Sequence, residues 1–337
     1  MIYNDPVYGK VDIKEPVILE IIRSKPLQRL KKISQHGPSV YNKYYTKRVI
    51  SRFEHSLGVF ILLKKLGASL EEQIAGLLHD VGHTVFSHTI DFLYPEENGE
   101  YDKKHHKELI NNSKIPEILK KYNVRLKKVL DESKFTILEK SLPGLCADRI
   151  DYFLRDPFLP KSFNKNLVLD NLLVFKGQII FKNKKAALYF SKQYLKMNEL
   201  FWARPLDELL YFLMVDIFKK ALAEKLIKYT DLFLTEDEFL DKLKKIKNQY
   251  INNKLDLIKN IKLRQVVVSK NKISQSYYVK SKIRVVDPLV LNGDKIERLS
   301  SLNLEYKNKA KDFYNKHSRK RWIGYKLSNK GKVHPVK

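Results

Sequence analysis

The segment AGLLHDVGHTVFSH, residues 75–88, constrains the fold more than any other part of the chain. Its otherwise apolar run contains four side chains that bind metals or protons: His79, Asp80, His83 and His88. The apolar neighbours favour burial, but a buried polar ring without partners costs about 1–3 kcal/mol. A fold that buries this segment must therefore supply a partner that satisfies these groups together.

The histidines of the chain are concentrated in one region. Seven of the nine lie between residues 36 and 106, namely His36, His55, His79, His83, His88, His105 and His106. One divalent metal ion takes up the lone pairs of several imidazoles at once, and imidazole combined with carboxylate suits such ions. The sequence therefore predicts a bound divalent metal ion, which could be Mn, Fe, Ni, Zn or Mg.

Helical spacing predicts how these side chains are grouped. The apolar pattern favours a helix that runs to Gly82, where His79 and His83, four residues apart, share one face. His88 and Asp91 are three residues apart and should share a face of the next segment. We therefore expect one polar surface built from two consecutive segments.

Hydrophobic periodicity predicts helices over most of the chain and β-rich runs at two places. A hairpin is expected in residues 171–185, with its turn at Lys176 and Gly177. A long helix should follow over residues 185–226, kinked or split at Pro205. Alternating β-branched and polar residues then predict a small antiparallel sheet within residues 265–291.

The chain is strongly basic, with a formal net charge of +27. Residues 304–337 alone hold eleven Lys and Arg against two acidic residues. Such a field attracts polyanions, so the basic C-terminal part predicts weak nucleic-acid binding as a secondary property. The alternative explanation is a lysine-rich composition without function, because lysine is abundant in most segments.

Other features indicate a soluble protein of the cytoplasm. The single cysteine, Cys146, excludes an internal disulfide. Apolar runs such as residues 59–63 are far shorter than the roughly 20 residues of a membrane span, and the N-terminal residues lack a signal-peptide pattern. We therefore expect no membrane association. We also expect a homo-oligomer, with a dimer favoured.

Five segments resemble a known family in their order along the chain. SRFEHSLGV (51–59), AGLLHDVGHTVFSH (75–88) and ADRIDYFLRD (147–156) resemble the signature segments of the HD-domain metal-dependent phosphohydrolases. DPVYGKV (5–11) and PLQRLKKISQHG (26–37) resemble, more narrowly, the branch of deoxynucleoside triphosphate triphosphohydrolases. The resemblance therefore implies a hydrolase that acts on a phosphate ester.

This resemblance also implies a fold and a division of the chain. It predicts a mainly α fold, an HD-domain helical bundle with a smaller C-terminal α+β part. Residues 1–160 would form the catalytic domain. Residues 161–337 would complete the substrate pocket and end in a basic tail.

The resemblance assigns roles to individual residues. The metal ligands would be His55, His79, Asp80 and Asp148. A metal held in this way acts as a Lewis acid and lowers the pKa of its bound water, which would attack a phosphate and release nucleoside and triphosphate. His83 and Asp91 match the catalytic pair, and a further histidine, which His106 fits better than His105, would join them.

The remaining matches concern the substrate. Residues expected to contact the phosphates are Arg52, His88, Arg149 and, more distantly, Arg204. Residues expected near the sugar are Gln35, His36, Tyr152 and Asp156. Asp151 and Arg155 are four residues apart and should form a structural ion pair.

Three departures from the branch concern substrate recognition. His36 stands where the branch has an apolar residue against the deoxyribose, and Tyr8 replaces a histidine. After Arg204 the chain reads PLDELLYFL, without the branch's sugar- and base-binding His, Tyr and Gln. Three hypotheses follow: a dNTP triphosphohydrolase, a phosphohydrolase for another ester such as a nucleoside monophosphate or cyclic nucleotide, and a nucleic-acid-binding protein with a structural metal.

Overall fold

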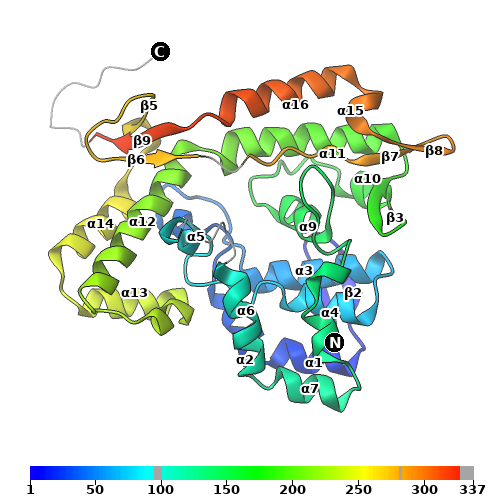
Figure 1. Cartoon of the computed structure of the whole chain (residues 1–337), viewed down its shortest axis with the longest axis horizontal. Coiled ribbons are helices and arrows are strands. Elements are labelled where there is room, and N and C mark those ends of the chain that lie inside the picture. Colours follow the sequence, from blue (N-terminus) through cyan, green and yellow to red (C-terminus); the bar gives the residue numbers. More distant parts are fainter. Residues whose placement is uncertain (95–100, 281–282, 327–337) are drawn as a thin grey trace.

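The computed structural model describes residues 1–94, 101–280 and 283–326, and helices dominate them (Figure 1). The predicted mainly α fold is thus confirmed. The elements of the first half are β1 (Ile2–Asp5), β2 (Gly9–Asp12), α1 (Pro16–Arg23), α2 (Lys25–Arg29), α3 (Arg52–Lys65), α4 (Leu70–Leu78), α5 (Thr89–Leu93), α6 (Tyr101–Asn111), α7 (Ile115–Lys121), α8 (Leu126–Val129) and α9 (Ala147–Arg155).

The second half combines longer helices with short strands. Its elements are α10 (Lys165–Leu169), β3 (Leu172–Phe175), β4 (Gln178–Phe181), α11 (Lys184–Met197), α12 (Pro205–Ala223), α13 (Glu236–Lys245), α14 (Gln249–Asn260), β5 (Val266–Ser269), β6 (Ser276–Val279), β7 (Leu289–Asn292), β8 (Lys295–Arg298), α15 (Leu299–Leu302), α16 (Leu304–His317) and β9 (Arg321–Tyr325). In Figure 1, α16 runs alongside α11. None of the helices in the described ranges is long and apolar enough to span a bilayer.

Helix α3 is the central helix of the first half. It begins with a capping box, in which the Ser51 hydroxyl accepts the Glu54 N–H while the Glu54 carboxylate accepts the Ser51 N–H. Nearly every side chain from Arg52 to Leu63 is buried, because α3 packs against α4 and α9. A helix buried on most sides holds its polar side chains in fixed positions.

Helix α4 ends earlier than the sequence predicts. It stops at Leu78, so the predicted helical face shared by His79 and His83 is wrong. In the turn that follows, the Arg29 guanidinium donates to the carbonyl oxygens of Val81 at 2.9 Å and His83 at 2.7 Å. In a continued helix, backbone N–H groups would bond these oxygens instead. The histidine segment is therefore a compact turn rather than a helical face.

The predicted hairpin and helix break are both confirmed. β3 and β4 pair in antiparallel register around Lys176 and Gly177, whose φ angles of 46° and 69° suit a tight turn. The expected long helix is split, because α11 ends at Met197 and α12 starts with Pro205 in its first turn. Proline is well placed there, since the first turn of a helix does not need its N–H.

The predicted sheet within residues 265–291 is only partly correct. β5 and β6 do not pair with each other but flank β9 on its two sides, both antiparallel. β7 instead lies parallel to β4 and joins the sheet β3-β4-β7-β8. A period of two marks a strand, but it does not specify the partner, which here is supplied from far along the chain.

Glu236, the first residue of α13, ties the second half to loops beside the histidine segment. It is only 3% exposed, and its Oε1 accepts N–H groups from Ser34 at 3.0 Å and Phe86 at 3.1 Å. Its Oε2 accepts the Tyr41 hydroxyl at 2.7 Å. Phe86 has a φ of +57°, which is unfavourable for a bulky residue, and the hydrogen bond from Glu236 helps to hold this backbone conformation.

We expect Glu236→Gln to change how stability depends on pH. Burial raises the pKa of Glu236 to about 7, against the hydrogen bonds from Tyr41, Ser34 and Phe86 that lower it. Between the pKa of the unfolded chain, about 4.3, and about 7, the wild type loses stability as pH rises, because the unfolded carboxyl ionises first. The glutamine variant lacks this loss.

The unfolding free energy measured at pH 5 and pH 8 tests this expectation. On going from pH 5 to pH 8, the unfolding free energy of Glu236→Gln should rise by at least about 1 kcal/mol relative to that of wild type. Glu238→Gln is the matched control on the same helix. The Thr235 hydroxyl and N–H lower the pKa of Glu238. Its carboxyl is therefore ionised in both states from pH 5 to pH 8, and its variant should keep a constant difference from wild type over this interval. Equal behaviour of the two variants would contradict the role of Glu236.

Candidate metal centre and active site

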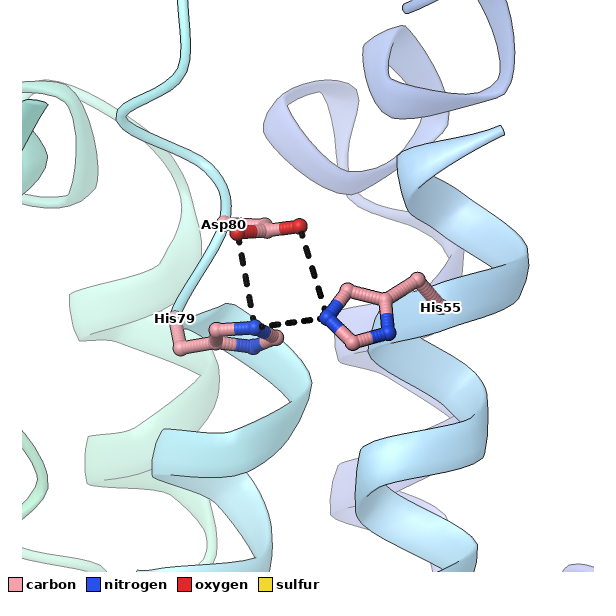
Figure 2. Close-up of side chains that lie close together, drawn as sticks. All are labelled: His55, His79 and Asp80. Atoms are coloured by element: carbon pink, nitrogen blue, oxygen red, sulfur yellow. Dashed lines mark hydrogen bonds and ion pairs between the residues drawn. The ribbon is translucent and has the colours of Figure 1, made fainter. Parts of the chain in front are cut away.

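Three ligand-type side chains from separate elements converge on one point. Figure 2 shows His55 on α3, His79 at the end of α4 and Asp80 in the next turn, pointing toward one another. His55 Nε2 lies 3.3 Å from His79 Nε2 and 4.0 Å from Asp80 Oδ2. His79 Nε2 lies 3.4 Å from Asp80 Oδ1. These atoms form one mutually close group that could hold a metal ion.

Asp148 of α9 adds a fourth candidate ligand. Its Oδ1 lies 2.9 Å from His55 Nε2 and 3.7 Å from His79 Nε2. Adjacent ligands of an octahedral ion with bonds of about 2.1 Å are about 3 Å apart, so these spacings fit a single ion. Two imidazoles and two carboxylates also suit a divalent ion and leave octahedral positions for other oxygen ligands.

The second ring nitrogen of each histidine is already bonded to a neighbouring oxygen. His55 Nδ1 lies 2.8 Å from Asp151 Oδ2, and His79 Nδ1 lies 2.7 Å from the Gly76 carbonyl oxygen. Both acceptors favour a proton on Nδ1, which leaves Nε2 with a lone pair directed at the centre. This arrangement is how proteins orient imidazole ligands of metals.

Asp151 belongs to a buried network that begins at the N-terminal turn. Arg155 binds Asp151 through two hydrogen bonds of 2.9 Å each, so the predicted ion pair is confirmed. Arg155 Nη2 also lies 3.0 Å from Asp5 Oδ2, and the Tyr8 hydroxyl donates to Asp151 Oδ1 at 2.8 Å. The network therefore connects the first residues of the chain to His55.

Gly58 leaves the space that this network occupies. It lies one turn after His55 on α3, and a Cβ atom there would be 2.0 Å from both Arg155 Nη2 and Asp151 Oδ1. No heavy atom can be accommodated at that distance. The glycine in SRFEHSLGV is thus required by the charge pair that orients the histidine.

The charges of the centre perturb one another strongly. Burial opposes ionisation of Asp80, but the Arg52 guanidinium and both neighbouring histidines hold the pKa of its carboxyl well below the usual range. Burial likewise opposes protonation of His79, yet the Asp80 and Asp148 carboxylates raise its pKa to about 10. Without a metal ion, a proton on His79 therefore compensates the negative charge of these carboxylates. A bound cation takes over this role, so metal binding should release protons.

Arg52, a predicted phosphate contact, lies directly beside the centre. It is 3% exposed, and its Nη1 donates to Asp80 Oδ2 at 2.8 Å. Its Nε donates to the Ser87 hydroxyl at 2.7 Å, and Ser87 in turn bonds the Ser34 carbonyl oxygen. The guanidinium is thus fixed at the edge of the site, and its contact with phosphate stays a prediction.

Of the predicted catalytic pair, His83 contacts the oxygen of Asp80 that Arg52 does not bond, and Asp91 is reached through His88. His83 Nε2 is 3.1 Å from Asp80 Oδ1, and the His83 and His88 rings meet edge to face at 5.1 Å. His88 Nδ1 lies 3.0 Å from Asp91 Oδ2, as the three-residue spacing predicts. The structure therefore gathers the catalytic and phosphate candidates of this segment into one group.

The two neighbouring histidines of α6 point in different directions. His106 is buried, and its Nε2 lies 2.9 Å from the carbonyl oxygen of Leu78, the residue that precedes His79. His105 faces Glu108 at 3.2 Å, near the surface. Of the two, His106 is therefore the one beside the HD pair, and its catalytic role stays a prediction.

Three of the predicted sugar contacts, His36, Tyr152 and Asp156, form a second group next to α9. Asp156 accepts the Trp202 indole N–H at 2.8 Å and lies 3.6 Å from His36 Nε2. His36 Nδ1 lies 2.9 Å from the Tyr45 hydroxyl, and Tyr152 meets the Trp202 ring edge to face. Gln35 precedes His36, and its N–H bonds the Ile50 carbonyl oxygen at 2.8 Å.

The other two predicted phosphate contacts are engaged within the chain. Arg149 donates to the Gly144 carbonyl oxygen at 2.7 Å and the Lys140 carbonyl oxygen at 3.0 Å. Arg204 pairs with Asp207 at 2.6 Å and lines a cleft of about 610 Å³ that the metal-ligand candidates do not line. A phosphate would have to compete with internal partners at all three arginines, and Arg52 is the one of them that bonds a metal-ligand candidate, Asp80.

Comparison with known proteins identifies the family. The family model described as HD domain matches residues 52–156, which contain all four metal-ligand candidates. The Bacillus subtilis protein YdhJ is 35% identical over 93% of this chain and 95% of its own length. The chain belongs to the HD-domain metal-dependent phosphohydrolases. It is therefore a hydrolase that uses a divalent metal ion.

Two further relatives support this HD phosphohydrolase assignment. The metal-dependent phosphohydrolase cns2 of Cordyceps militaris is 35% identical over 61% of each chain. The deoxynucleoside triphosphate triphosphohydrolase SAMHD1 of Mus musculus is 30% identical over 42% of this chain and 24% of its own length. The second likeness covers only part of either protein and supports the family rather than a substrate.

Three residues near the HD phosphohydrolase site were not found from the sequence. The sequence assigns Asp151 only to the pair with Arg155, whereas in the structure its Oδ2 also bonds His55 Nδ1. Glu236 lies 150 residues beyond Phe86 and carries no motif. Arg284 lies close enough to Tyr152 to favour its phenolate, against the burial that raises the pKa of Tyr152 to about 12.

We expect the double variant His79→Ala, Asp80→Ala to lose the metal. Wild-type protein purified without chelator should contain about one divalent metal ion per chain by elemental analysis, and the double variant almost none. His105→Ala is the control, because this histidine faces Glu108 instead of the centre. Unchanged metal content in the double variant would show that the metal binds elsewhere.

We expect Asp151→Asn to weaken metal binding by about 10- to 100-fold, because an amide no longer fixes the His55 ring. Asp5→Asn is the matched control, since Asp5 contacts Arg155 in the same network without touching His55. Both variants should unfold more easily, but only Asp151→Asn should strongly weaken Mn²⁺ binding in titration calorimetry. An equal loss in both would mean that Asp151 acts only through stability.

Proposed function

We propose that this chain hydrolyses nucleotides, with deoxynucleoside triphosphates as the first candidate substrates, releasing nucleoside and triphosphate. The observation that carries the proposal is the arrangement of α9 and its C-cap. Asp148, Tyr152 and Asp156 are spaced by four residues, so they follow one face from the metal centre to the His36 group. On this surface a nucleotide would place its phosphates at the metal centre and its sugar beside Tyr152 and Asp156.

The residues of the site would have different chemical roles. A divalent ion at the four ligands would act as a Lewis acid toward phosphate and water oxygens. His83, 3.1 Å from Asp80, is the residue of this chain best placed to hold or move a proton there. Burial lowers the pKa of His88, and the charges of Arg52 and His83 act in the same direction, against Asp91, which raises it. Because His88 Nδ1 is bonded to Asp91, His88 would donate its second N–H to a phosphate oxygen only when the ring is protonated, which the negative charge of the phosphate favours.

The charge around Tyr152 supports an anionic substrate. The Arg284 and Arg149 guanidinium groups both act to lower the pKa of Tyr152, so both positive charges lie near its hydroxyl. Arg52, which bonds Asp80, adds a third fixed cation. Several fixed cations around a metal suit a substrate with more than one phosphate, because each extra phosphate adds negative charge.

The surroundings of His36 support a second candidate, a ribonucleotide or another phosphate ester. An apolar wall rejects a 2′-hydroxyl by leaving it without a partner. His36 is instead held between Tyr45 and Asp156, so polar atoms line this wall. We therefore propose weaker selectivity for deoxyribose than an apolar residue at this position would give.

A substrate panel tests the proposal. Metal-loaded protein is incubated with dNTPs, NTPs, nucleoside monophosphates and cyclic nucleotides, and the products are identified by chromatography. Triphosphate together with a deoxynucleoside would establish the first candidate, whereas inorganic phosphate from a monophosphate would establish the second. No hydrolysis of any member would contradict both.

His83→Ala provides the control for adventitious phosphatase activity. It should lower the rate by about 10²–10⁴-fold while metal content and folding stay unchanged. His36→Leu should raise the ratio of dNTP to NTP hydrolysis, since it restores an apolar wall. An unchanged ratio would show that His36 does not contact the sugar.

A further inference from the structure

The outer face of the sheet β5-β9-β6 carries two neighbouring aromatic side chains. Trp322 of β9 lies directly opposite Ser269 of β5 and Tyr278 of β6. The next residue, Ile323, is fully buried, so Trp322 and Tyr278 face away from the core. Their ring centroids are 5.1 Å apart, and Tyr278 is 53% exposed. Trp322 is half-buried, so the outer face presents one exposed and one partly exposed ring side by side.

Each of these rings is accompanied by a lysine. Lys272 Nζ lies 5.7 Å from the centroid of Trp322, and Lys320 Nζ lies 5.5 Å from the centroid of Tyr278. Both lysines are exposed, and they come from the loops that precede β6 and β9. We call these four residues the aromatic platform. It combines flat apolar surfaces with positive charge at their edges.

The segments that build this sheet contain no acidic residue. Residues 257–286 hold eight Lys and Arg, and residues 313–326 hold five, without a single Asp or Glu. The whole chain has 38 acidic residues against 65 basic ones, so acids are common elsewhere. If lysine were simply abundant along the whole chain, acidic residues would still occur in these segments. Instead, two separate segments without acidic residues meet in one sheet (Figure 1).

The inner face of the sheet is already covered. Tyr277 stacks on Phe212 of α12 at 5.1 Å, and Arg321 Nη2 pairs with Glu208 of α12 at 2.8 Å. The sheet is therefore fixed to α12 through its inner face. The platform on the outer face is held in place without being needed for that packing.

We propose that the aromatic platform binds single-stranded nucleic acid. Unpaired bases would stack on Trp322 and Tyr278, while Lys272 and Lys320 would neutralise the adjacent phosphates. Base stacking on aromatic side chains combined with cationic contacts to the backbone is how many proteins bind single strands without sequence preference. A duplex hides its base faces and could use only the lysines. The platform is independent of the proposed hydrolysis, since it contains none of the metal-site residues.

Fluorescence anisotropy with labelled oligothymidylate of about 20 nucleotides, longer than a typical site of 4–16 nucleotides, tests this proposal. The full-length protein should bind the single strand more tightly than a duplex of equal length. Tyr278→Ala and Trp322→Ala should each weaken binding of the single strand by about fivefold or more. Lys272→Glu with Lys320→Glu should weaken it further and reduce its dependence on salt.

Two matched controls separate the platform from general surface charge. Tyr229→Ala removes another exposed tyrosine, and Lys120→Glu with Lys127→Glu makes the same charge change on another surface. Both should leave oligothymidylate affinity within about twofold of wild type at physiological salt. Circular dichroism checks that Tyr278→Ala, whose side chain is largely exposed, is folded.

Three results would overturn the proposal. The first is absence of oligothymidylate binding even at low salt. The second is equal affinity for single strand and duplex that Tyr278→Ala does not change, which would indicate charge alone. The third is binding of the platform to vesicles containing anionic phosphatidylserine with no affinity for the oligonucleotide, which would assign the surface to a membrane.

Discussion

The hydrogen bond between Asp151 and His55 is the contact on which the arrangement of the site depends. It fixes the ring so that Nε2 faces the other ligands, and it holds because Asp151 is itself bound by Arg155 and Tyr8. A buried carboxylate without such partners would be very unfavourable. The N-terminal turn, which supplies Asp5 and Tyr8, therefore acts on the metal centre although it contributes no ligand.

A second set of contacts supports the centre from the other half of the chain. Glu236 binds Ser34 and Phe86, Ser87 bonds Ser34, and Arg52 connects Ser87 to Asp80. Through this chain of hydrogen bonds the start of α13 influences the position of a metal-ligand candidate. The HD domain and the C-terminal part thus share one buried polar system, and they also share one hydrophobic core.

The sequence predicts the features that local chemistry determines. The histidine and aspartate motifs, the hairpin at Lys176 and the helix break before Pro205 all depend on residues close together in the chain. The end of α4 at Leu78 and the pairing of β5 and β6 with β9 depend on Arg29 and on residues 321–325, which are distant. The role of Glu236 was inaccessible for the same reason, because a buried carboxyl that binds distant N–H groups has no local pattern.

The most direct test of the metal centre is anomalous scattering from crystals grown with Mn²⁺. The geometry predicts one strong peak within about 2.0–2.4 Å of the Nε2 atoms of His55 and His79 and of an oxygen of Asp80 and of Asp148. A peak confined instead to the neighbouring group of Glu139 and Cys146, with none between the two histidines, would contradict the account.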